Sequence, residues 1–457
     1  MEERKWRPVD ALMADFHTVP ALAFSAGDIS GRRHVYEKGQ QTMHAKMPMA
    51  SSSKFPASLA VASVIEAGFV SFDTPVHAVF SWWTSDAADA RMRHLVTLRH
   101  LLTMTSGLVS QDNHGDSEAP CIHPSSSRDY TPEDCARAIY ANSRLWSARP
   151  GVVWSYNNLH LQVAGAMAAR AANLTVGEML EHHLIRKLGL LSTSWRDMDT
   201  NPPLAGGMIS SGNDYEKVLQ AVLSYRGWSR ETIQTMERDA YEYFPGLQPA
   251  PNAKDSGIEC FGHYSMGLYL ECPEQPWDDA CRRKAVRGNP GALGYWPVLN
   301  RARRYYMQLV VHYERRASRE LMKRLQLPES VAGALPALCV SPLRFSLTAP
   351  VEVALGLHSG ADGTTDPWPS HLRHYTFPWN LLCELMASTE AADRERAVAA
   401  AEGRHGVSSA DVRHALARNA SARLANGLAA GHKLHLQPGE GPMCARRPET
   451  RGRNLSR

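Results

Sequence analysis

Two short stretches of the chain carry residue types that could perform acyl transfer. The first pairs a serine with a lysine three residues later, Ser51 and Lys54. The second pairs a tyrosine with an asparagine two residues later, Tyr156 and Asn158. A serine hydroxyl is a poor nucleophile until a neighbouring group accepts its proton, and an amine can do so when it is neutral. Together the two stretches predict a serine acyl-transfer site that uses no histidine.

The spacing of the first pair fits the start of a helix. If a helix begins at Ser51, residues three apart lie on one face, so Lys54 Nζ can reach Ser51 Oγ. The unpaired N–H groups of a helix start can also hold a developing oxyanion. The mostly apolar run from Leu59 to Val70 predicts that this is a core helix. Ser52 and Ser53 have no lysine three residues on, so Ser51 is the predicted nucleophile.

A serine and a lysine at this spacing also occur by chance, and the alternative is a capped surface helix. The segments that follow favour a catalytic interpretation. In order they are Glu66–Val70, Phe72–Val76, Val96–Leu108, Pro150–Gly151 and Ala205–Ser211. This series resembles the serine β-lactamase and penicillin-binding-protein family, and most of all its class C-like branch with D-alanyl-D-alanine carboxypeptidases and related esterases. The resemblance runs from about residue 21 to about residue 321, and the segment LRHLLTMTSGL is its most specific marker.

The resemblance implies an α+β fold of the β-lactamase/transpeptidase type. In that fold an antiparallel sheet is flanked by helices, and a helical subdomain, here roughly residues 75–264, faces it across the active-site cleft. We therefore expect a catalytic domain over residues 1–328 and a C-terminal extension over 329–457, partly disordered because its end is rich in arginine. The polar loop Gln111–Ser127 is expected to roof the site, and a closing helix is expected over Arg316–Leu325.

A third motif of the family, K-T-G or H-x-G on a strand, is best matched by Asn289, Pro290 and Gly291. A strand over Tyr295–Leu299, a turn and a second strand over Tyr305–His312 would follow it. In the family the glycine lets substrate approach and the next residue, here Ala292, donates an oxyanion N–H. Asn289 stands where lysine or histidine is usual. The alternative is a Gly/Asn/Pro-rich turn without a catalytic part.

By resemblance, Ser51 attacks a carbonyl and forms an acyl-enzyme that water then hydrolyses. Lys54 accepts the proton, directly or together with Tyr156, and the sequence leaves the identity of the base open. Asn158 orients Lys54 and hydrogen bonds the substrate, while the N–H groups of Ser51 and Ala292 form the oxyanion hole. Asn289 and Gly291 line the substrate edge. The reaction needs no cofactor, and the substrate is a small molecule or peptide with an ester, amide or lactam bond.

Two departures from the family pattern support a rival hypothesis, a catalytically impaired pseudoenzyme that uses its cleft for binding or assembly. Asn289 lacks the usual charge, although Arg287 would share its face of the strand and could supply one. Pro56 is expected to remove a hydrogen bond from the first turn of the nucleophile helix and to bend it, which would displace Lys54. Against this, a scaffold has no need to keep Ser51, Lys54, Tyr156 and Asn158 together.

Composition agrees with a large enzyme-like chain. It has 457 residues, 44% of them hydrophobic, and a net charge of +4 with scattered basic residues, so no nucleic-acid partner is indicated. There is no H-E-x-x-H or C-x-x-C motif, so no metal site is predicted. His160 and His263 lie near the motifs and are expected to be ordinary packing or surface residues. The sequence does not indicate an oligomeric state.

Targeting signals and cysteine usage indicate the cellular compartment of a protein. No apolar run reaches the roughly 18 residues of a membrane span. The N-terminus does not resemble a signal peptide, which favours a cytoplasmic or intracellular location. Two of the cysteine pairs, Cys121 with Cys135 and Cys272 with Cys281, bracket short loops and could form disulfides. Without a signal, free thiols are expected instead.

Overall fold

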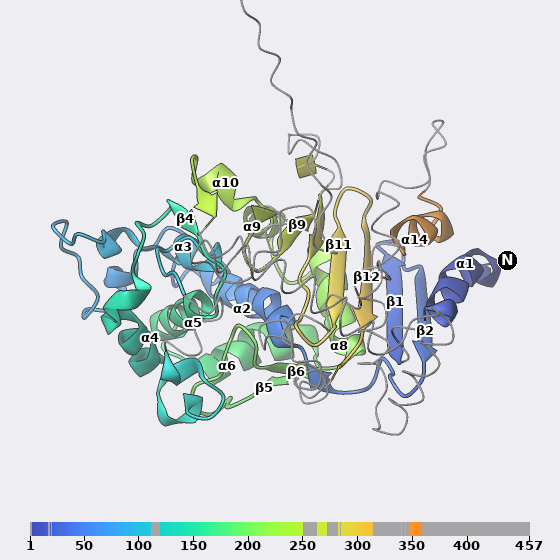
Figure 1. Ribbon diagram of the computed structural model, residues 1–457, viewed down its shortest axis with the longest axis horizontal. Coiled ribbons are helices and arrows are strands. Elements are labelled where there is room, and N and C mark those ends of the chain that lie inside the picture. The colour runs from blue at the N-terminus through green and yellow to red at the C-terminus, as the bar shows by residue number, and fades with distance from the viewer. Residues whose placement is uncertain are drawn as a thin grey trace, which may run out of the picture.

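The fold is centred on an antiparallel sheet. In the computed structural model the described residues are 2–16, 19, 21–110, 119–249, 263–271, 282–283, 285–313, 340, 343 and 347–357. Within them, seven strands form one sheet in the order β2-β1-β12-β11-β10-β9-β8 (Figure 1). The strands are β1 (Leu22–Asp28), β2 (Arg33–Lys38), β8 (His263–Tyr264), β9 (Tyr269–Glu271), β10 (Val286–Gly288), β11 (Trp296–Asn300) and β12 (Tyr305–Val310).

The hairpin that the sequence predicted over residues 295–312 is present, and it lies beside a second hairpin. β1 pairs with β2, and β11 pairs with β12, all antiparallel. The sheet is completed when β12 pairs with β1, with Ser25 opposite Gln308. Strands from near the start of the chain and from about residue 300 therefore meet in the middle of the sheet. The prediction of an α+β fold with an antiparallel sheet is confirmed.

The helix α2 (Lys54–Glu66) lies between the sheet and the helical subdomain (Figure 1). Eleven consecutive residues, Lys54 to Val64, are buried, so this helix is enclosed on all sides. Its apolar side chains pack against α5 and α6 of the subdomain. A helix that is apolar all round belongs in the interior, as the sequence predicted.

The helical subdomain is assembled from short elements joined by turns (Figure 1). Its helices are α3 (Leu98–Leu102), α4 (Pro132–Ala141), α5 (Leu159–Ala171), α6 (Val176–Leu180), a π-helix (Glu181–Ile185), α7 (Arg186–Leu188), α9 (Arg230–Met236) and α10 (Ala240–Tyr243). The helix α8 (Gly212–Leu223) instead packs on β1, β11 and β12 of the sheet. Single 3₁₀ turns occur at Val76–Ala78, Arg93–Leu95, Pro120–Ile122 (η4), Ser127–Asp129 and Ser143–Leu145. Two small sheets join β3 (Met47–Pro48), β6 (Met208–Ser210) and β5 (Ser194–Trp195), and β4 (Val153–Trp154) with β7 (Gln248–Pro249).

The helices α1 (Glu2–Asp15) and α14 (Thr348–Ala354) contact each other at the end of the molecule beyond β2 (Figure 1). Leu347 and Val351 are fully buried in the apolar cluster that also holds side chains of α1 and of the sheet. These residues lie beyond the expected domain boundary at residue 328. We infer that the catalytic domain extends at least to Leu357.

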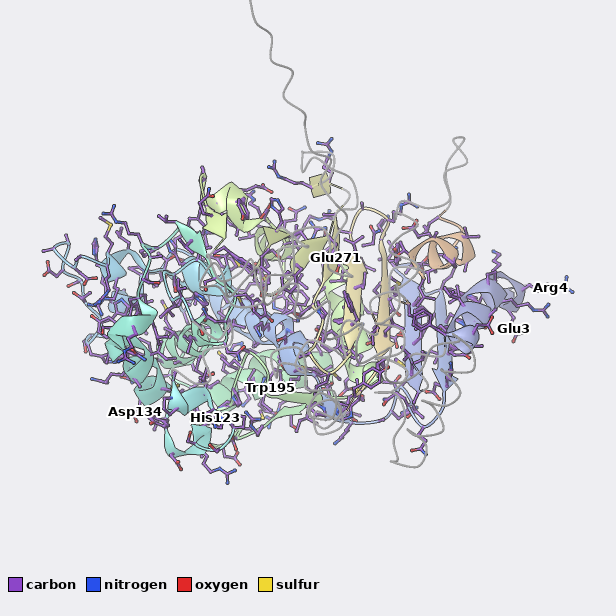
Figure 2. The ribbon with its side chains drawn as sticks, viewed as in Figure 1. Glu3, Arg4, His123, Asp134, Trp195 and Glu271 are labelled. Atoms are coloured by element: carbon purple, nitrogen blue, oxygen red, sulfur yellow. A yellow bond between two sulfur atoms is a disulfide. The ribbon has the colours of Figure 1, made fainter. Side chains whose placement is uncertain are left out.

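A disulfide joins Cys121 to Cys135 and so ties η4 to α4. The expectation of free thiols is therefore wrong for this pair. His123 and Asp134, which adjoin the two cysteines in the sequence, lie at the lower edge of the subdomain (Figure 2). The other predicted pair, Cys272 with Cys281, lies outside the described residues.

Three further expectations also fall outside the described part of the chain, in whole or in part: the first half of the roof loop, the closing helix over 316–325, and most of the C-terminal extension. Within the described ranges, no helix is both long enough and apolar enough to cross a bilayer.

Candidate active site

The predicted nucleophile lies in a tight turn ahead of α2. Ser51 belongs to the 3₁₀ turn η1 (Ala50–Ser53), and the α-helix begins at Lys54, three residues later than expected. Ala50, just before the serine, has φ of 47°, in the left-handed region that favours glycine. Such a conformation costs a non-glycine residue on the order of 1–3 kcal/mol and is concentrated at functional sites. The strained conformation of Ala50 is therefore consistent with a functional site at this turn.

The Lys54 amine is fully buried and meets three oxygen atoms. Its Nζ lies 3.0 Å from Ser51 Oγ, 3.0 Å from Asn158 Oδ1 and 3.1 Å from the main-chain oxygen of Ala205. A carbonyl oxygen only accepts, so two N–H bonds of a neutral amine would point to Asn158 and Ala205. The lone pair would then face Ser51, which is the arrangement that a general base requires. In the ammonium form, all three oxygens accept from Nζ.

Tyr156 follows β4 and is one wall of the site. Lys54 Nζ lies over its ring, 4.5 Å from the centroid. The ring stacks on Tyr269, at 5.7 Å between centroids, and meets Tyr264 edge-on at 6.2 Å. Burial raises the pKa of both Tyr264 and Tyr269 well above the ordinary phenol value, so these two neighbours stay neutral. One phenol ring thus covers the buried amine, and two further phenol rings hold that ring in place.

The turn that holds Tyr156 and Asn158 is fixed from behind by His160, which is fully buried. Its Nε2 lies 2.9 Å from the Ser155 carbonyl oxygen, so Nε2 carries the proton and donates. Ser106 Oγ lies 3.0 Å from Nδ1 and donates to it. Burial lowers the pKa of His160 to about 4, which keeps the ring neutral. The expectation of a packing residue is confirmed.

Ser106 belongs to the LRHLLTMTSGL segment, so that segment supports the tyrosine turn. Asn157 adds to the same support, because its Nδ2 donates to the carbonyl oxygen of Leu108 at 3.1 Å. Sequence reasoning recognised this segment as a marker but did not assign it this contact.

The third motif lies against the nucleophile turn. The Asn289 N–H donates to the Pro297 carbonyl oxygen of β11 at 3.3 Å. In an antiparallel ladder Pro297 should donate in return, but proline has no N–H. The hydroxyl of Ser52 donates to the Asn289 carbonyl oxygen instead, at 2.5 Å. Ser52 is therefore fully buried and engaged, in agreement with the choice of Ser51 as nucleophile.

Gly291 is required because the third motif lies so close to the nucleophile turn. A Cβ at this position would lie 2.4 Å from the Met49 carbonyl oxygen and 3.1 Å from Ser52 Oγ. Any side chain would force the strand away from the nucleophile turn. Ala292 lies in the turn that leads into β11.

The Asn289 side chain is buried, with 1% exposed, in contrast to a residue that lines an open cleft. Its amide lies near the Tyr215 hydroxyl, but among the described residues neither Oδ1 nor Nδ2 has a partner at hydrogen-bonding geometry. An unpaired buried amide costs about 1–3 kcal/mol, which is unusual at a purely structural position.

Arg287 does not supply the missing charge to the cleft. Its Nε lies 3.2 Å from Glu237 Oε2, and both side chains are nearly buried. Glu237 also forms an ion pair with Arg301, with 2.6 Å between the charged atoms. The suggestion that Arg287 compensates for Asn289 is wrong, because a buried carboxylate already holds the guanidinium.

Pro56 does not displace Lys54. It is the third residue of α2, where the N–H groups have no partner within the helix. The carbonyl oxygen of Ser52, four residues earlier, accepts a hydrogen bond from the Tyr215 hydroxyl at 2.8 Å. The Tyr215 phenol thus takes the place of the missing N–H, and Nζ of Lys54 reaches Ser51. The expectation of a displaced lysine is wrong.

The sheet, the enclosed helix and the partly exposed serine beside a buried lysine are the arrangement of the β-lactamases and penicillin-binding proteins. A sequence profile of the β-lactamase family matches residues 9–266, more than half of the chain. The chain belongs to the β-lactamase family. The match ends before Asn289, so the third motif lies outside it, and the class C-like branch stays a prediction.

Solved structures agree with this fold. A putative β-lactamase from Bacteroides dorei DSM 17855 is 21% identical over 68% of this chain and 91% of its own, with a TM-score of 0.55. The octameric penicillin-binding protein homologue from Pyrococcus abyssi is 18% identical over 74% and 81%, with a TM-score of 0.51. Simvastatin synthase from Aspergillus terreus is 19% identical over 67% and 93%, also with a TM-score of 0.51. No curated protein matches the chain.

Proposed function

We propose that the protein is a serine hydrolase that acts through an acyl-enzyme on an ester, amide or lactam. The observation that carries this proposal is the 3.0 Å approach of Lys54 Nζ, which is fully buried, to Ser51 Oγ, whose residue is partly exposed. Two fixed acceptors, Asn158 Oδ1 and the Ala205 carbonyl oxygen, orient the amine toward the serine. This is the nucleophile, base and orienting group of a covalent catalyst.

In the acylation step, Ser51 Oγ bonds to the substrate carbonyl carbon and its proton moves to Lys54 Nζ. The leaving group then departs with a proton delivered from the ammonium. Tyr156 contacts Lys54 through its ring face and assists this transfer. In the second step water attacks the acyl carbon, gives a proton to the same base, and restores the Ser51 hydroxyl as the acid leaves.

The oxyanion hole of the proposal consists of the N–H groups of Ser51 and Ala292. The N–H groups of Asn289 and Gly291 donate to β11, at Pro297 and Tyr295 respectively. Along an extended strand, successive N–H groups point to opposite sides. The alternation ends at Gly291, where the chain enters the turn that holds Ala292. It also explains why Pro290 is tolerated there, since a proline lacks only the outward-pointing N–H.

The proposed substrate class is small neutral esters rather than carboxylate-bearing β-lactams. A lysine or histidine at the position of Asn289 would give a charge-assisted hydrogen bond, about twice as strong as a neutral one. Asn289 carries no charge and its amide is buried, and Glu237 already neutralises Arg287. The described part of the third motif therefore presents no free cation for a substrate carboxylate.

Labelling with a fluorophosphonate probe tests the proposal. Ser51 Oγ should bond to phosphorus, fluoride should leave, and the serine proton should pass to Lys54. Mass mapping should find the adduct on Ser51 alone. Ser51→Ala should abolish labelling with an almost unchanged thermal midpoint, whereas Ser224→Ala, an exposed serine on α8's end, should label like the parent. Labelling that survives Ser51→Ala would refute the assignment.

The comparisons lend no support to the alternative of a pseudoenzyme. The folded parent's failure to react with the probe at any pH would favour that alternative, and would overturn the proposed function.

A further inference from the structure

We propose that Gln162 and Asn201 are positioning residues that set the proton-accepting geometry of Lys54 from outside the catalytic motifs. The proposal rests on the proposed function, because it concerns the acylation step at Ser51. Neither residue touches the serine or the lysine. Both hold the loop of residues 201–205, which begins with Asn201 itself. The last residue of this loop, Ala205, supplies the carbonyl oxygen that Lys54 Nζ meets.

Gln162 lies on α5, four residues after Asn158, and is almost completely buried. Its Nε2 donates to Asn201 Oδ1 at 2.7 Å and to the Pro202 carbonyl oxygen at 3.2 Å. Its Oε1 accepts from the Leu204 N–H at 3.3 Å. One glutamine amide therefore holds the loop at Asn201, Pro202 and Leu204, and the residue after Leu204 supplies the acceptor for Lys54.

Close packing holds the same loop against α5. A Cβ at Gly165 would lie only 1.9 Å from Leu204 Cδ1, so the glycine leaves room for the leucine side chain. After Ala205 the chain turns tightly, with the Gly207 N–H donating to the Pro203 carbonyl oxygen at 2.7 Å. The loop has fixed contacts on both sides of Ala205, and its carbonyl cannot follow Lys54 if the amine moves.

Asn201 extends this arrangement to the disulfide. It is fully buried, and its Nδ2 donates to the carbonyl oxygens of Cys121, at 2.8 Å, and Ser127, at 3.2 Å. Cys121 is bonded to Cys135 on α4. The disulfide-bound segment, Asn201, Gln162 and the Ala205 carbonyl therefore form a continuous buried path that ends at Lys54. The main-chain carbonyls along it accept only, so each amide can take one orientation.

The physical consequence concerns the lone pair of Lys54. When the Ala205 carbonyl is in place, one N–H of the amine is committed to it, another is committed to Asn158, and the lone pair faces Ser51. If Gln162 is lost, the carbonyl is free to shift, the amine loses a fixed acceptor, and its ammonium form is less stabilised. We expect slower acylation and a pH profile whose midpoint moves to lower pH.

The test compares second-order rates of Ser51 phosphonylation across pH in the full chain. Gln162→Met preserves size and removes all three hydrogen bonds. Its rate should fall between about 10- and 100-fold, the order expected when a reacting group shifts by about 1 Å. Gln162→Glu preserves the acceptor for Leu204 and removes both donors, so it should be intermediate in rate. It also covers the case in which Gln162→Met fails to fold.

Gln308 provides a matched control on the sheet. It is fully buried and likewise makes three hydrogen bonds, with Ser25 Oγ, the Gly212 carbonyl oxygen and the Tyr295 hydroxyl. Gln308→Met should lower the thermal midpoint about as much as Gln162→Met, because each loses three buried bonds. It should leave the midpoint of the pH profile where it is in the parent.

A second readout needs no chemistry at Ser51. In ¹⁵N-lysine-labelled protein the pH dependence of the Lys54 Nζ resonance, assigned by its loss in Lys54→Met, should differ from that of the parent in Gln162→Met and match it in Gln308→Met. An unreactive parent would overturn the proposed function and leave this measurement decisive. If Gln162→Met and Gln308→Met have the same pH dependence in both readouts, Gln162 is merely structural and the inference is wrong.

Discussion

Ser52 donates its hydroxyl to the Asn289 carbonyl oxygen at 2.5 Å, opposite a proline that cannot make that bond. The same residue accepts, at its own carbonyl oxygen, the Tyr215 hydroxyl in place of the N–H that Pro56 lacks. Two prolines thus leave two main-chain oxygens unpaired beside the nucleophile, and two hydroxyl groups pair them. Ser52 joins the third motif to the nucleophile turn without taking part in the chemistry.

The first prediction concerns Ser52→Ala. The Asn289 carbonyl would lose the Ser52 donor at a position that Pro297 cannot serve, and an unpaired buried acceptor costs about 1–3 kcal/mol. We expect that loss in the free energy of unfolding, measured in urea, together with slower labelling of Ser51. Adding Pro297→Ala supplies a main-chain N–H opposite Asn289 and should recover part of both losses.

The Pro297→Ala rescue makes this prediction specific. Pro297→Ala alone should have little benefit, because Ser52 already satisfies the carbonyl. If the effects of the two substitutions simply add, the Ser52 hydroxyl does not substitute for the missing N–H, and our interpretation of this contact is wrong.

The second prediction concerns substrate class. Asn289→Lys should raise the rate of lactam acylation relative to ester hydrolysis, because an ammonium group can pair with the substrate carboxylate. Asn289→Met, of similar length and without charge, is the control and should not raise the ratio. Efficient hydrolysis of penicillins or cephalosporins by the parent would contradict the account of Asn289. An unchanged ratio in Asn289→Lys would contradict it as well.

The third prediction concerns stability at mildly acidic pH. Burial lowers the pKa of His100 and of His160 from 6.5 to about 4 in each case. Between these values the unfolded chain binds a proton that the folded chain does not, so stability is complete above pH 6.5 and falls as the pH approaches 4. A shift of this size corresponds to about 3 kcal/mol for each histidine. Urea unfolding at several pH values should show the loss.

His160→Gln isolates one of the two contributions. Glutamine has no titratable group, so the variant should lose less stability on acidification than the parent, although it is less stable at neutral pH. An equal dependence on pH in the two proteins would show that His160 does not titrate as its burial indicates.

Local patterns predicted individual elements, whereas the fold class was implied by the resemblance to a known family. The hairpin β11–β12 follows from short β-rich runs separated by turn residues, and α2 follows from an apolar segment behind a serine–lysine pair. These signals depend on neighbours in sequence, which is why they could be recognised without a structure. The π-helix at Glu181–Ile185 and the later start of α2 have no such local signature.

The structure brings Ser51, Lys54, Tyr156 and Asn158 together, as the motifs predicted. The supporting residues were missed because their roles depend on contacts between segments far apart in sequence. Gln162 and Asn201 match no motif. In the sequence, a glutamine within a helix cannot be distinguished from an ordinary polar residue. The effect of Pro56 was misjudged for the same reason, since only the folded chain brings Tyr215 to the carbonyl that the proline leaves unpaired.

The last prediction concerns the end of the catalytic domain. A chain that ends at Asp393 retains α14 and should be folded, with the same ester turnover as the full chain. A chain that ends at Tyr313 lacks Leu347 and Val351, which are fully buried against the cluster that contains α1 and the sheet. Burying one such side chain contributes about 1.5–3 kcal/mol, so the shorter chain should have a lower thermal midpoint.

Leu347→Ala in the full chain is the control and should lower the midpoint without truncation. If the chain ending at Tyr313 is as stable as the parent, α14 is dispensable and the domain ends near residue 328 as first expected; if the chain ending at Asp393 fails to fold, residues beyond it belong to the domain.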